Sequence, residues 1–408
     1  MKIKRETYLG KLRELRGTHL IKVVTGIRRV GKSTLLADFR AELLASGVPG
    51  SRVHFVNFEE RKNLGLTDWT VLHDEIEATL DPLGMNYVFL DEIQMVAGFE
   101  RLLDSLFVKP DTDIYVTGSN AFLLSGELAT LLSGRHISIN VLPYSFAEFA
   151  LAHPGQSVDT LFRAYINAST LPEAVNLSAH APGQVNQYLR DVFETVVRKD
   201  IVTRAAIRDI SNFESVVRFA FDSVGSFVSP RRITDRLNAG RKKGETGISH
   251  NTVESYLQRL TGAFVLYKAD RYDIKGRNLL KTQQKYYCVD LGLKNAMSGM
   301  NRGLNTGHKL ENIVYLELRR RYQGDIWVGK HDESEVDFVV QNHAEERRYY
   351  QVAWSAAEPD TLERELRPLR KIKDNYPKIL LTADPDNETF EGIRKVNVVD
   401  WLAGNTDA

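Results

Sequence analysis

Short apolar runs alternate with segments of helical spacing over the first 140 residues of the chain. These runs are rich in β-branched residues, and they lie at 21–25, 52–58, 86–90, 113–118 and 136–142. Continuous apolar runs between helices are typical of strands in a parallel sheet that is covered on both faces. Five such units predict a doubly wound α/β domain.

The pattern changes at about residue 143, where strand-like runs stop and helical spacing takes over. Helical spacing continues to about residue 265, and two strand-like runs follow around the turn "DIKGRN". An α/β pattern then returns from residue 307 and includes "EVDFVV", "RRYYQVAW" and "KILLTA". We therefore expect four parts, at 1–145, 146–205, 206–298 and 299–408, the second of which is a helical lid.

Composition places the chain among soluble globular proteins, with 408 residues, 43% hydrophobic and 26% charged. No apolar run reaches the roughly 18 residues that a membrane span needs, so we expect no membrane partner. The start, "MKIKRETYLG", has no apolar segment of a secretory signal. Cys288 is the single cysteine and cannot form an internal disulfide. These features predict a cytoplasmic protein.

The stretch "TGIRRVGKST" matches the phosphate-binding pattern G-x-x-x-x-G-K-[ST], also called Walker A. It has a predicted strand before it and a predicted helix after it, as the pattern requires. The backbone N–H groups of such a loop cradle phosphates, the lysine neutralises phosphate oxygens and the serine hydroxyl ligates Mg²⁺. The predicted ATP-binding residues are Gly26, Ile27, Arg28, Arg29, Val30, Gly31, Lys32, Ser33 and Thr34.

Further polar residues follow the later strands. Asp91 and Glu92 end the run "VFLDE" (the Walker B position), where Asp91 suits a Mg²⁺ ligand and Glu92 suits the catalytic base. Asn120, or less favourably Ser119, could position the attacking water after the next strand. Arg135 precedes the last strand and could reach the γ-phosphate of a neighbouring subunit. Together they predict Mg²⁺-dependent ATP hydrolysis.

These motifs resemble those of the AAA+ superfamily. The fuller set, with "FLDEIQ", "LLSGELATLLSGR", "LPYSFAEF" and "LPEAV", is similar to one branch of it. Members of that branch carry an AAA+ ATPase domain and a C-terminal region called DUF4143. The resemblance implies a homo-oligomer, as a hexameric ring or spiral, in which Arg135 acts in trans.

Basic charge is concentrated between residues 228 and 290, where thirteen Lys and Arg stand against six Asp and Glu. The segment resembles a winged helix, and it favours contact with the backbone of duplex or branched DNA. The inward positions of its second helix are predicted to be Ile248, Val253, Tyr256, Leu257 and Leu260. The candidate DNA-binding residues are Arg241, Lys242, Lys243, His250, Asn251, Arg259, Lys275 and Arg277.

The last part resembles the restriction-endonuclease-like PD-(D/E)XK core, with Glu311 opening a helix and Asp337 in a strand. Gln351 stands where that core has its second acid, and Ala353 stands where it has its lysine. A neutral amide is a weaker Mg²⁺ ligand than a carboxylate, and the sequence does not require Lys330 to compensate. We expect a nuclease-shaped domain without activity.

The leading hypothesis is therefore an AAA+ motor that hydrolyses ATP to translocate on, unwind or branch-migrate DNA. An ATP-dependent switch that binds another protein, as in stress or defence, is the alternative. A metal-dependent nuclease gated by ATP is disfavoured by Gln351 and Ala353.

Overall fold

The computed structural model describes residues 2–118, 134–203, 207, 209–239, 247–298, 305–322, 324–342 and 344–407. They form two compact units, one of Met1–Leu142 with Gly262–Phe264 and one of Pro143–Thr261 with Val265–Ala408. The four predicted parts are a finer division and stay a prediction. Among the described helices, none combines the length and the apolar character needed to cross a membrane.

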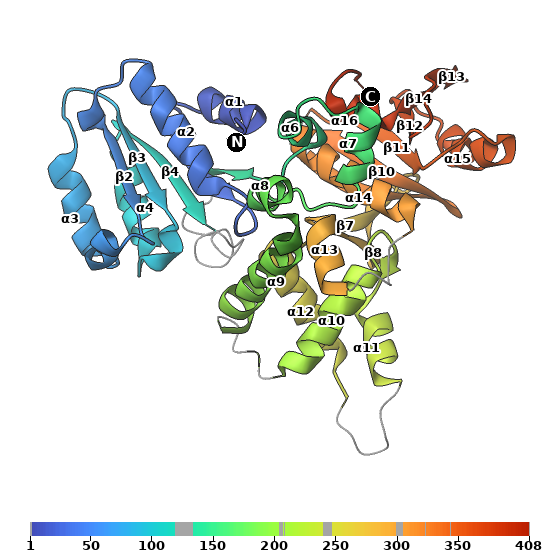
Figure 1. Cartoon of the computed structure of the whole chain (residues 1–408), viewed down its shortest axis with the longest axis horizontal. Coiled ribbons are helices and arrows are strands. Elements are labelled where there is room, and N and C mark those ends of the chain that lie inside the picture. Colours follow the sequence, from blue (N-terminus) through green and yellow to red (C-terminus); the bar gives the residue numbers. More distant parts are fainter. Residues whose placement is uncertain are drawn as a thin grey trace. The chain divides into compact units, whose positions relative to one another are not determined.

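The first unit is built on a five-stranded sheet with the order β2-β3-β4-β1-β5 (Figure 1). Every neighbouring pair in it is parallel, as the alternation of strands and helices predicted. The strands are β1 (Ile21–Thr25), β2 (Val53–Asn57), β3 (Asn86–Asp91), β4 (Thr112–Gly118) and β5 (His136–Asn140). All residues of β1, β3 and β4 are buried, whereas β2 and β5 at the edges are partly exposed.

Helices cover both faces of this sheet. The helices are α1 (Glu6–Glu14), α2 (Lys32–Ala45), α3 (Trp69–Thr79) and α4 (Phe99–Phe107), with short 3₁₀ turns at Gly50–Arg52, Arg61–Leu66 and Ile93–Met95. Val88 and Leu90 of β3 share a core cluster with apolar residues of α3 and α4. Between them in the strand, Phe89 faces the opposite way and contacts Phe39 of α2. Alternate strand residues therefore serve two helical layers, which explains the continuous apolar runs.

The second unit begins with helices. They are α6 (Phe146–Leu151), α7 (Val158–Tyr165), α8 (Pro172–His180), α9 (Val185–Thr195), a π-helical segment (Val196–Thr203), α10 (Ile210–Asp222), α11 (Pro230–Asn238) and α12 (His250–Gly262), with a 3₁₀ turn at Pro182–Gln184. The five positions predicted to face inward are all buried, with at most 7% exposure; four of them lie in α12, and Ile248 lies two residues before it. His250 and Asn251 lie on its exposed side.

A nine-stranded mixed sheet forms the rest of this unit, with the order β13-β14-β12-β11-β10-β9-β7-β8-β6. Its strands are β6 (Phe227–Val228), β7 (Leu266–Asp273), β8 (Asn278–Cys288), β9 (Gly324–His331), β10 (Ser334–Asn342), β11 (Arg347–Ala353), β12 (Lys378–Thr382), β13 (Glu388–Phe390) and β14 (Ile393–Asn397). Its helices are α13 (Leu291–Ser298), α14 (Thr306–Arg321), α15 (Pro359–Lys371) and α16 (Val398–Ala403) (Figure 1).

The hairpin β7–β8, predicted as a wing, is part of this same sheet because β7 pairs in parallel with β9. Strand β9 was not predicted, since its sequence "GDIWVGKH" mixes apolar residues with glycine and charge. One sheet thus runs through strands from two of the predicted parts, 206–298 and 299–408.

Candidate functional site

The loop between β1 and α2 has the backbone shape of a phosphate cradle. Gly26 has a φ of 141°, and a Cβ atom there would lie 2.3 Å from the carbonyl oxygen of Val141, so only glycine fits. Arg29 and Gly31 are also left-handed, with φ values of 66° and 96°. Alternation of left- and right-handed residues turns successive N–H groups inward to form an anion-binding concavity. Helix α2 starts at Lys32, so its N-terminal N–H groups point to the same place.

Lys32 is held against this loop. Its side chain is almost fully buried, and Nζ donates to the carbonyl oxygens of Gly26 at 3.1 Å and Ile27 at 3.3 Å. A buried ammonium needs partners to offset its desolvation, and the loop carbonyls supply them. The amine therefore lies beside the cradle, and a change in the conformation of this one flexible side chain is enough to bring it to a phosphate bound there.

Asp91, at the end of β3, is linked to the cradle by two hydroxyl groups. Ser33 Oγ donates to Asp91 Oδ1 at 3.1 Å, and Thr117 Oγ1 donates to the same oxygen at 2.5 Å. Asp91 is fully buried, and its other oxygen, Oδ2, makes no hydrogen bond within the described part of the chain. Burial raises the pKa of Asp91, although both hydroxyl groups oppose that shift. A carboxylate oxygen beside a serine hydroxyl is a donor set that suits Mg²⁺.

Thr117 was missed by the sequence reasoning, which placed the polar residues of this strand end at Ser119 and Asn120. Both of those residues lie outside the described part of the chain. Thr117 ends up beside Asp91 because β4 lies between β1 and β3 in the sheet. Its hydroxyl also accepts a hydrogen bond from the backbone N–H of Glu92 at 2.8 Å. The one available signal was a threonine directly before Gly118 at the end of a buried strand.

Glu92 adopts a conformation that is unusual for a residue with a side chain. Its φ is 59°, in the left-handed region, directly after β3. Such backbone strain in a non-glycine residue is uncommon and gathers at functional sites. The side chain is 8% exposed and accepts a hydrogen bond from Gln94 Nε2. Glu92 is thus a buried carboxylate in the turn directly after Asp91, the last residue of β3.

Arg135 lies just before β5, and its side chain contacts residues of the same chain. It forms an ion pair with Asp104 of α4, and its guanidinium lies 5.3 Å from the ring centre of Phe107. About 42% of its side chain remains exposed. Reaching a neighbouring subunit would require this ion pair to open, so the predicted trans action stays a prediction.

The candidate DNA-binding residues are spread over α12 and the β7–β8 turn. His250, Asn251, Lys275 and Arg277 are exposed, and Arg259 is half-buried. Arg241, Lys242 and Lys243 lie outside the described residues. Lys275 Nζ forms an exposed ion pair with Asp332 Oδ1 at 3.2 Å.

Three of the four residues predicted for the nuclease-like site, Glu311, Asp337 and Gln351, come together. Glu311 is buried within α14, not at its start as predicted, because that helix begins at Thr306. Gln351 accepts from the backbone N–H of Asp337 at 3.4 Å and donates to Glu365 at 3.0 Å. Its amide thus links two neighbours by hydrogen bonds, at the position where the resemblance implies a second acid.

A lysine that sequence reasoning missed lies among these acids. Lys285 of β8 places Nζ 2.8 Å from Glu311 Oε1, 2.6 Å from Glu335 Oε1 and 3.9 Å from Asp337 Oδ1. Burial lowers the pKa of Lys285, but the three carboxylates outweigh burial and raise it. Burial and the Glu311 carboxylate raise the pKa of Asp337 well above its usual value, against the opposing effect of Lys285. Ala353, the remaining predicted residue, is buried and carries no charge.

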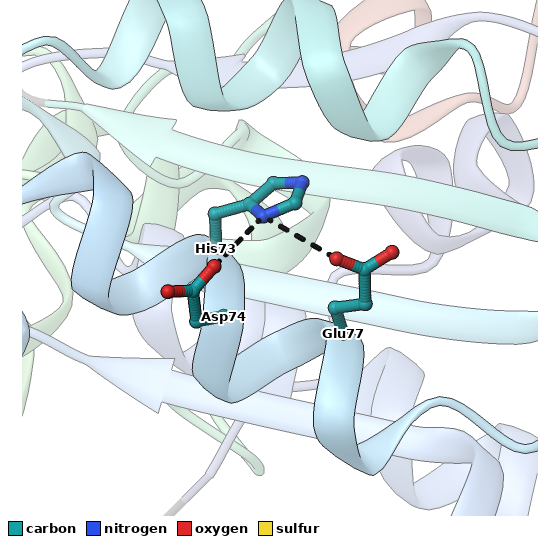
Figure 2. A group of neighbouring side chains, drawn as sticks. All are labelled: His73, Asp74 and Glu77. Atoms are coloured by element: carbon teal, nitrogen blue, oxygen red, sulfur yellow. Dashed lines mark ion pairs between the residues drawn. The ribbon is translucent and has the colours of Figure 1, made fainter.

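A separate group on α3, formed by His73, Asp74 and Glu77, has metal-ligand residue types (Figure 2). His73 Nδ1 lies 3.5 Å from Asp74 and 3.7 Å from Glu77. Each end of the group already has a partner, since Ser105 of α4 bonds His73 Nε2 and Lys109, two residues after α4, pairs with Glu77. A lysine beside a carboxylate competes with a metal ion, so we assign no metal to this group.

Two family models match parts of this chain. A family model described as "AAA domain" matches residues 18–150. A domain of unknown function, DUF8612, matches residues 159–303, so the matching region is DUF8612 and not the predicted DUF4143.

Similar chains and structures are known. An uncharacterized protein of Haemophilus influenzae is 38% identical over 410 residues, covering 98% of each chain. An uncharacterized protein of Methanocaldococcus jannaschii is 27% identical over 407 residues, covering 93% of this chain and 85% of the relative. The solved structure of the Aeropyrum pernix ORC1 protein in complex with DNA has 16% identity and a TM-score of 0.29, over 73% of this chain and 93% of that one. The crystal structure of Cdc6p from Pyrobaculum aerophilum has 14% identity and a TM-score of 0.29, over 76% and 94%.

The first of these relatives is similar over nearly its whole length, and the AAA match covers the cradle, Asp91, Glu92 and Thr117. The chain therefore belongs to the same family as the Haemophilus influenzae protein, and its N-terminal part is an AAA+ P-loop ATPase domain.

Proposed function

We propose that this protein is a Mg²⁺-dependent ATPase that uses hydrolysis to move duplex or branched DNA. The observation that carries the ATPase part is the link from Ser33 through Asp91 to Thr117, at the mouth of the phosphate cradle. Ser33 Oγ and Asp91 Oδ2 are the groups that we assign to Mg²⁺. The ion, when bound, offsets the negative charge of the phosphate oxygens.

The chain's own residues have distinct parts in the proposed reaction. The N–H groups of the cradle and the N-terminus of α2 bind the phosphates. Lys32 exchanges its bonds with the loop carbonyls for bonds with phosphate oxygens, which are stronger acceptors. Glu92 orients the attacking water and accepts its proton. Thr117 forms hydrogen bonds with both Asp91 and the backbone of Glu92, and so fixes the position of the metal ligand relative to the base.

Two variants test this assignment. Lys32→Ala is expected to lose ATP binding, measured by titration with a fluorescent ATP analogue. Glu92→Gln is expected to bind ATP but to lower kcat roughly 10²- to 10⁴-fold, the usual contribution of a general base. Glu60→Gln, which changes an exposed glutamate after β2, is the matched control. Turnover at the wild-type rate by Glu92→Gln would remove Glu92 from the role of base.

The DNA part of the proposal is supported by basic charge in the second unit. A pocket of about 330 Å³ is lined by cations that include Lys275, Arg277, Arg347 and Lys373. Two acids, Glu345 and Asp374, also line it. Within the described residues, Arg277 and Lys373 form no ion pair, so their charges are available to phosphates. The order α10–β6–α11–α12–β7–β8 is consistent with the winged helix that we propose.

Salt dependence and ATP turnover test the DNA part. We expect DNA to stimulate ATP turnover and its affinity to fall steeply with salt. The double variant Arg277→Ala/Lys373→Ala is expected to weaken binding for all sequences and to reduce the salt slope by roughly 2, about 1 for each lost phosphate contact. Arg163→Ala, at an exposed arginine of α7, is the control. If DNA is not retained at low salt and does not alter turnover, a protein-binding switch becomes the better explanation.

We further propose that ATP is hydrolysed in a homo-oligomer, a hexameric ring or spiral, with Arg135 serving the neighbouring site. The exposed fraction of Arg135 and its surface ion pair with Asp104 support this, because an exposed pair exchanges at little cost. Mixing Arg135→Ala with Lys32→Ala subunits tests it. A gain of activity over simple dilution supports action in trans, and no gain contradicts it.

A further inference from the structure

The acids of the nuclease-like site surround a lysine that belongs to a distant strand. Lys285 comes from β8, whereas Glu335 and Asp337 come from β10 and Glu311 comes from α14. The lysine is 5% exposed, Glu311 is 6% exposed and Asp337 is 9% exposed. Glu335 is less enclosed, with 35% of its side chain exposed. Two buried carboxylates with a third beside them need a cation nearby.

The ammonium of Lys285 meets that need with well-formed hydrogen bonds. Nζ bonds Glu311 Oε1 at 2.8 Å and pairs with Glu335 Oε1 at 2.6 Å. Nζ also lies 5.4 Å from the ring centre of Phe227 in β6, which is within the range of a cation–π contact. A lysine held on three sides behaves as a fixed charge and not as a mobile surface group.

One oxygen of Glu311 and one oxygen of Asp337 already accept hydrogen bonds. Glu311 Oε1 accepts from both Lys285 and the hydroxyl of Tyr287, the latter at 2.7 Å. Asp337 Oδ2 accepts from the backbone N–H of Val352 at 2.8 Å. A divalent cation would have to displace these donors and also exist beside an ammonium of like charge.

The spacing of the carboxylates also argues against a metal ion. Over the described ranges, the one group of three whose ligand atoms all lie within 4.8 Å of each other is His73, Asp74 and Glu77. The acids around Lys285 are therefore spaced more widely than that, with the ammonium between them. Gln351 and Ala353 remove the second acid and the lysine that a nuclease core of this shape uses. The residues present do not fit a resident divalent metal.

We propose that Lys285 is a resident cation that takes the place of the divalent metal in this nuclease-shaped core, and that removing its ammonium turns the cluster of Glu311, Glu335 and Asp337 into a divalent-cation site. A bulge in β10 supports the arrangement. The register between β9 and β10 shifts between Val336 and Val339, at the position of Asp337. Bulges re-aim a side chain, here toward the sheet face that Lys285 occupies. The proposal is independent of the ATPase and DNA proposals.

Mn²⁺ binding to the full-length protein, without nucleotide, tests the proposal. Free Mn²⁺ is measured by electron paramagnetic resonance for the wild type, Lys285→Ala, Lys285→Arg, Asp337→Asn and Lys285→Ala/Asp337→Asn. We expect the wild type and Asp337→Asn to bind the same amount, and Lys285→Ala to gain one equivalent, at least tenfold tighter than any wild-type binding. The double variant is expected to lose that equivalent. Lys285→Arg, which keeps a cation in place, is expected to gain none.

Thermal unfolding provides a second measurement that does not depend on activity. Lys285→Ala leaves the acids unpaired, so its Tm is expected to fall and then to rise with added Mn²⁺, because a ligand that binds the folded state stabilises it. The wild-type Tm is expected to change no more than that of Asp337→Asn. One equivalent of Mn²⁺ bound by the wild type and lost in Asp337→Asn would overturn the proposal. So would Mn²⁺-dependent DNA cleavage by the wild type that Asp337→Asn abolishes, or a folded Lys285→Ala protein that gains no Mn²⁺. The comparison of wild type with Asp337→Asn decides the question even where Lys285→Ala does not fold.

Discussion

Thr117 offers a sharp test of the nucleotide site, because valine has nearly the same shape and lacks only the hydroxyl. That hydroxyl donates to Asp91 Oδ1 at 2.5 Å and accepts from the N–H of Glu92 at 2.8 Å. Thr117 is fully buried, so water does not replace either bond in Thr117→Val. The substitution therefore removes one of the two hydroxyl groups bound to Asp91 and, at the same time, the hydrogen-bond partner of the Glu92 backbone.

Its expected magnitude follows from these two bonds. A buried N–H left without a partner costs about 1–3 kcal/mol, so the free energy of unfolding is expected to fall by roughly that amount. Thr117 also lowers the pKa of Asp91 against the effect of burial. Without it Asp91 is a poorer anion for Mg²⁺ and Glu92 is less well positioned. We expect kcat to fall about 10- to 100-fold, which corresponds to about 1.4–2.7 kcal/mol in the barrier.

Steady-state ATP turnover and urea unfolding are measured on the same preparations. Thr117→Ser keeps the hydroxyl and is expected to retain most of the activity. Thr112→Val is the matched control at the other end of β4, where the hydroxyl donates to the carbonyl oxygen of Leu106 at 2.9 Å. That variant is expected to lose stability with little change in kcat. If Thr117→Val turns over ATP within twofold of Thr112→Val, the reasoning about Thr117 is wrong.

Three further predictions concern stability and reactivity. Lys22 and Asp113 form a buried ion pair with a distance of 2.5 Å, and Lys22→Met leaves Asp113 without its counter-ion. Urea unfolding should therefore show a fall of about 3–5 kcal/mol in the free energy of unfolding, which Lys22→Met/Asp113→Asn should partly restore. A fall below about 1 kcal/mol would contradict this. Burial raises the pKa of Cys288 to about 12, so the native thiol should resist alkylation at pH 8 and react only on unfolding; rapid labelling of folded protein would refute its burial. The hydrogen bond from Arg13 lowers the pKa of Glu42 from 4.5 to about 2, so its stabilisation is complete above pH 4.5 and is lost as the pH falls through about 2. Since Arg13 is 41% exposed, solvent screening leaves about 1 kcal/mol, and Glu42→Gln should show that deficit at pH 7 but a smaller one at pH 3; an unchanged deficit would contradict the assignment.

Features that depend on neighbouring residues could be predicted from the sequence. The five parallel strands, the helix at Lys32–Ala45 and the helix at Phe99–Phe107 follow from local periodicity, and the structure places them at or near the expected residues. The phosphate cradle was also predictable, since its shape depends on glycines within one short loop. The same holds for the inward face of α12, whose apolar positions recur with the period of a helix.

Features that depend on distant segments were decided by the tertiary structure alone. Thr117 lies beside Asp91 only because β4 is inserted between β1 and β3, and a strand order of this kind leaves no mark in local spacing. Lys285 reaches acids on β10 and α14 although 26 residues separate it from Glu311. The sequence determined which segments are strands and helices, because side-chain periodicity is local. Folding decided which polar groups share a buried site, because only the packed chain excludes water and forces each buried charge to find a partner.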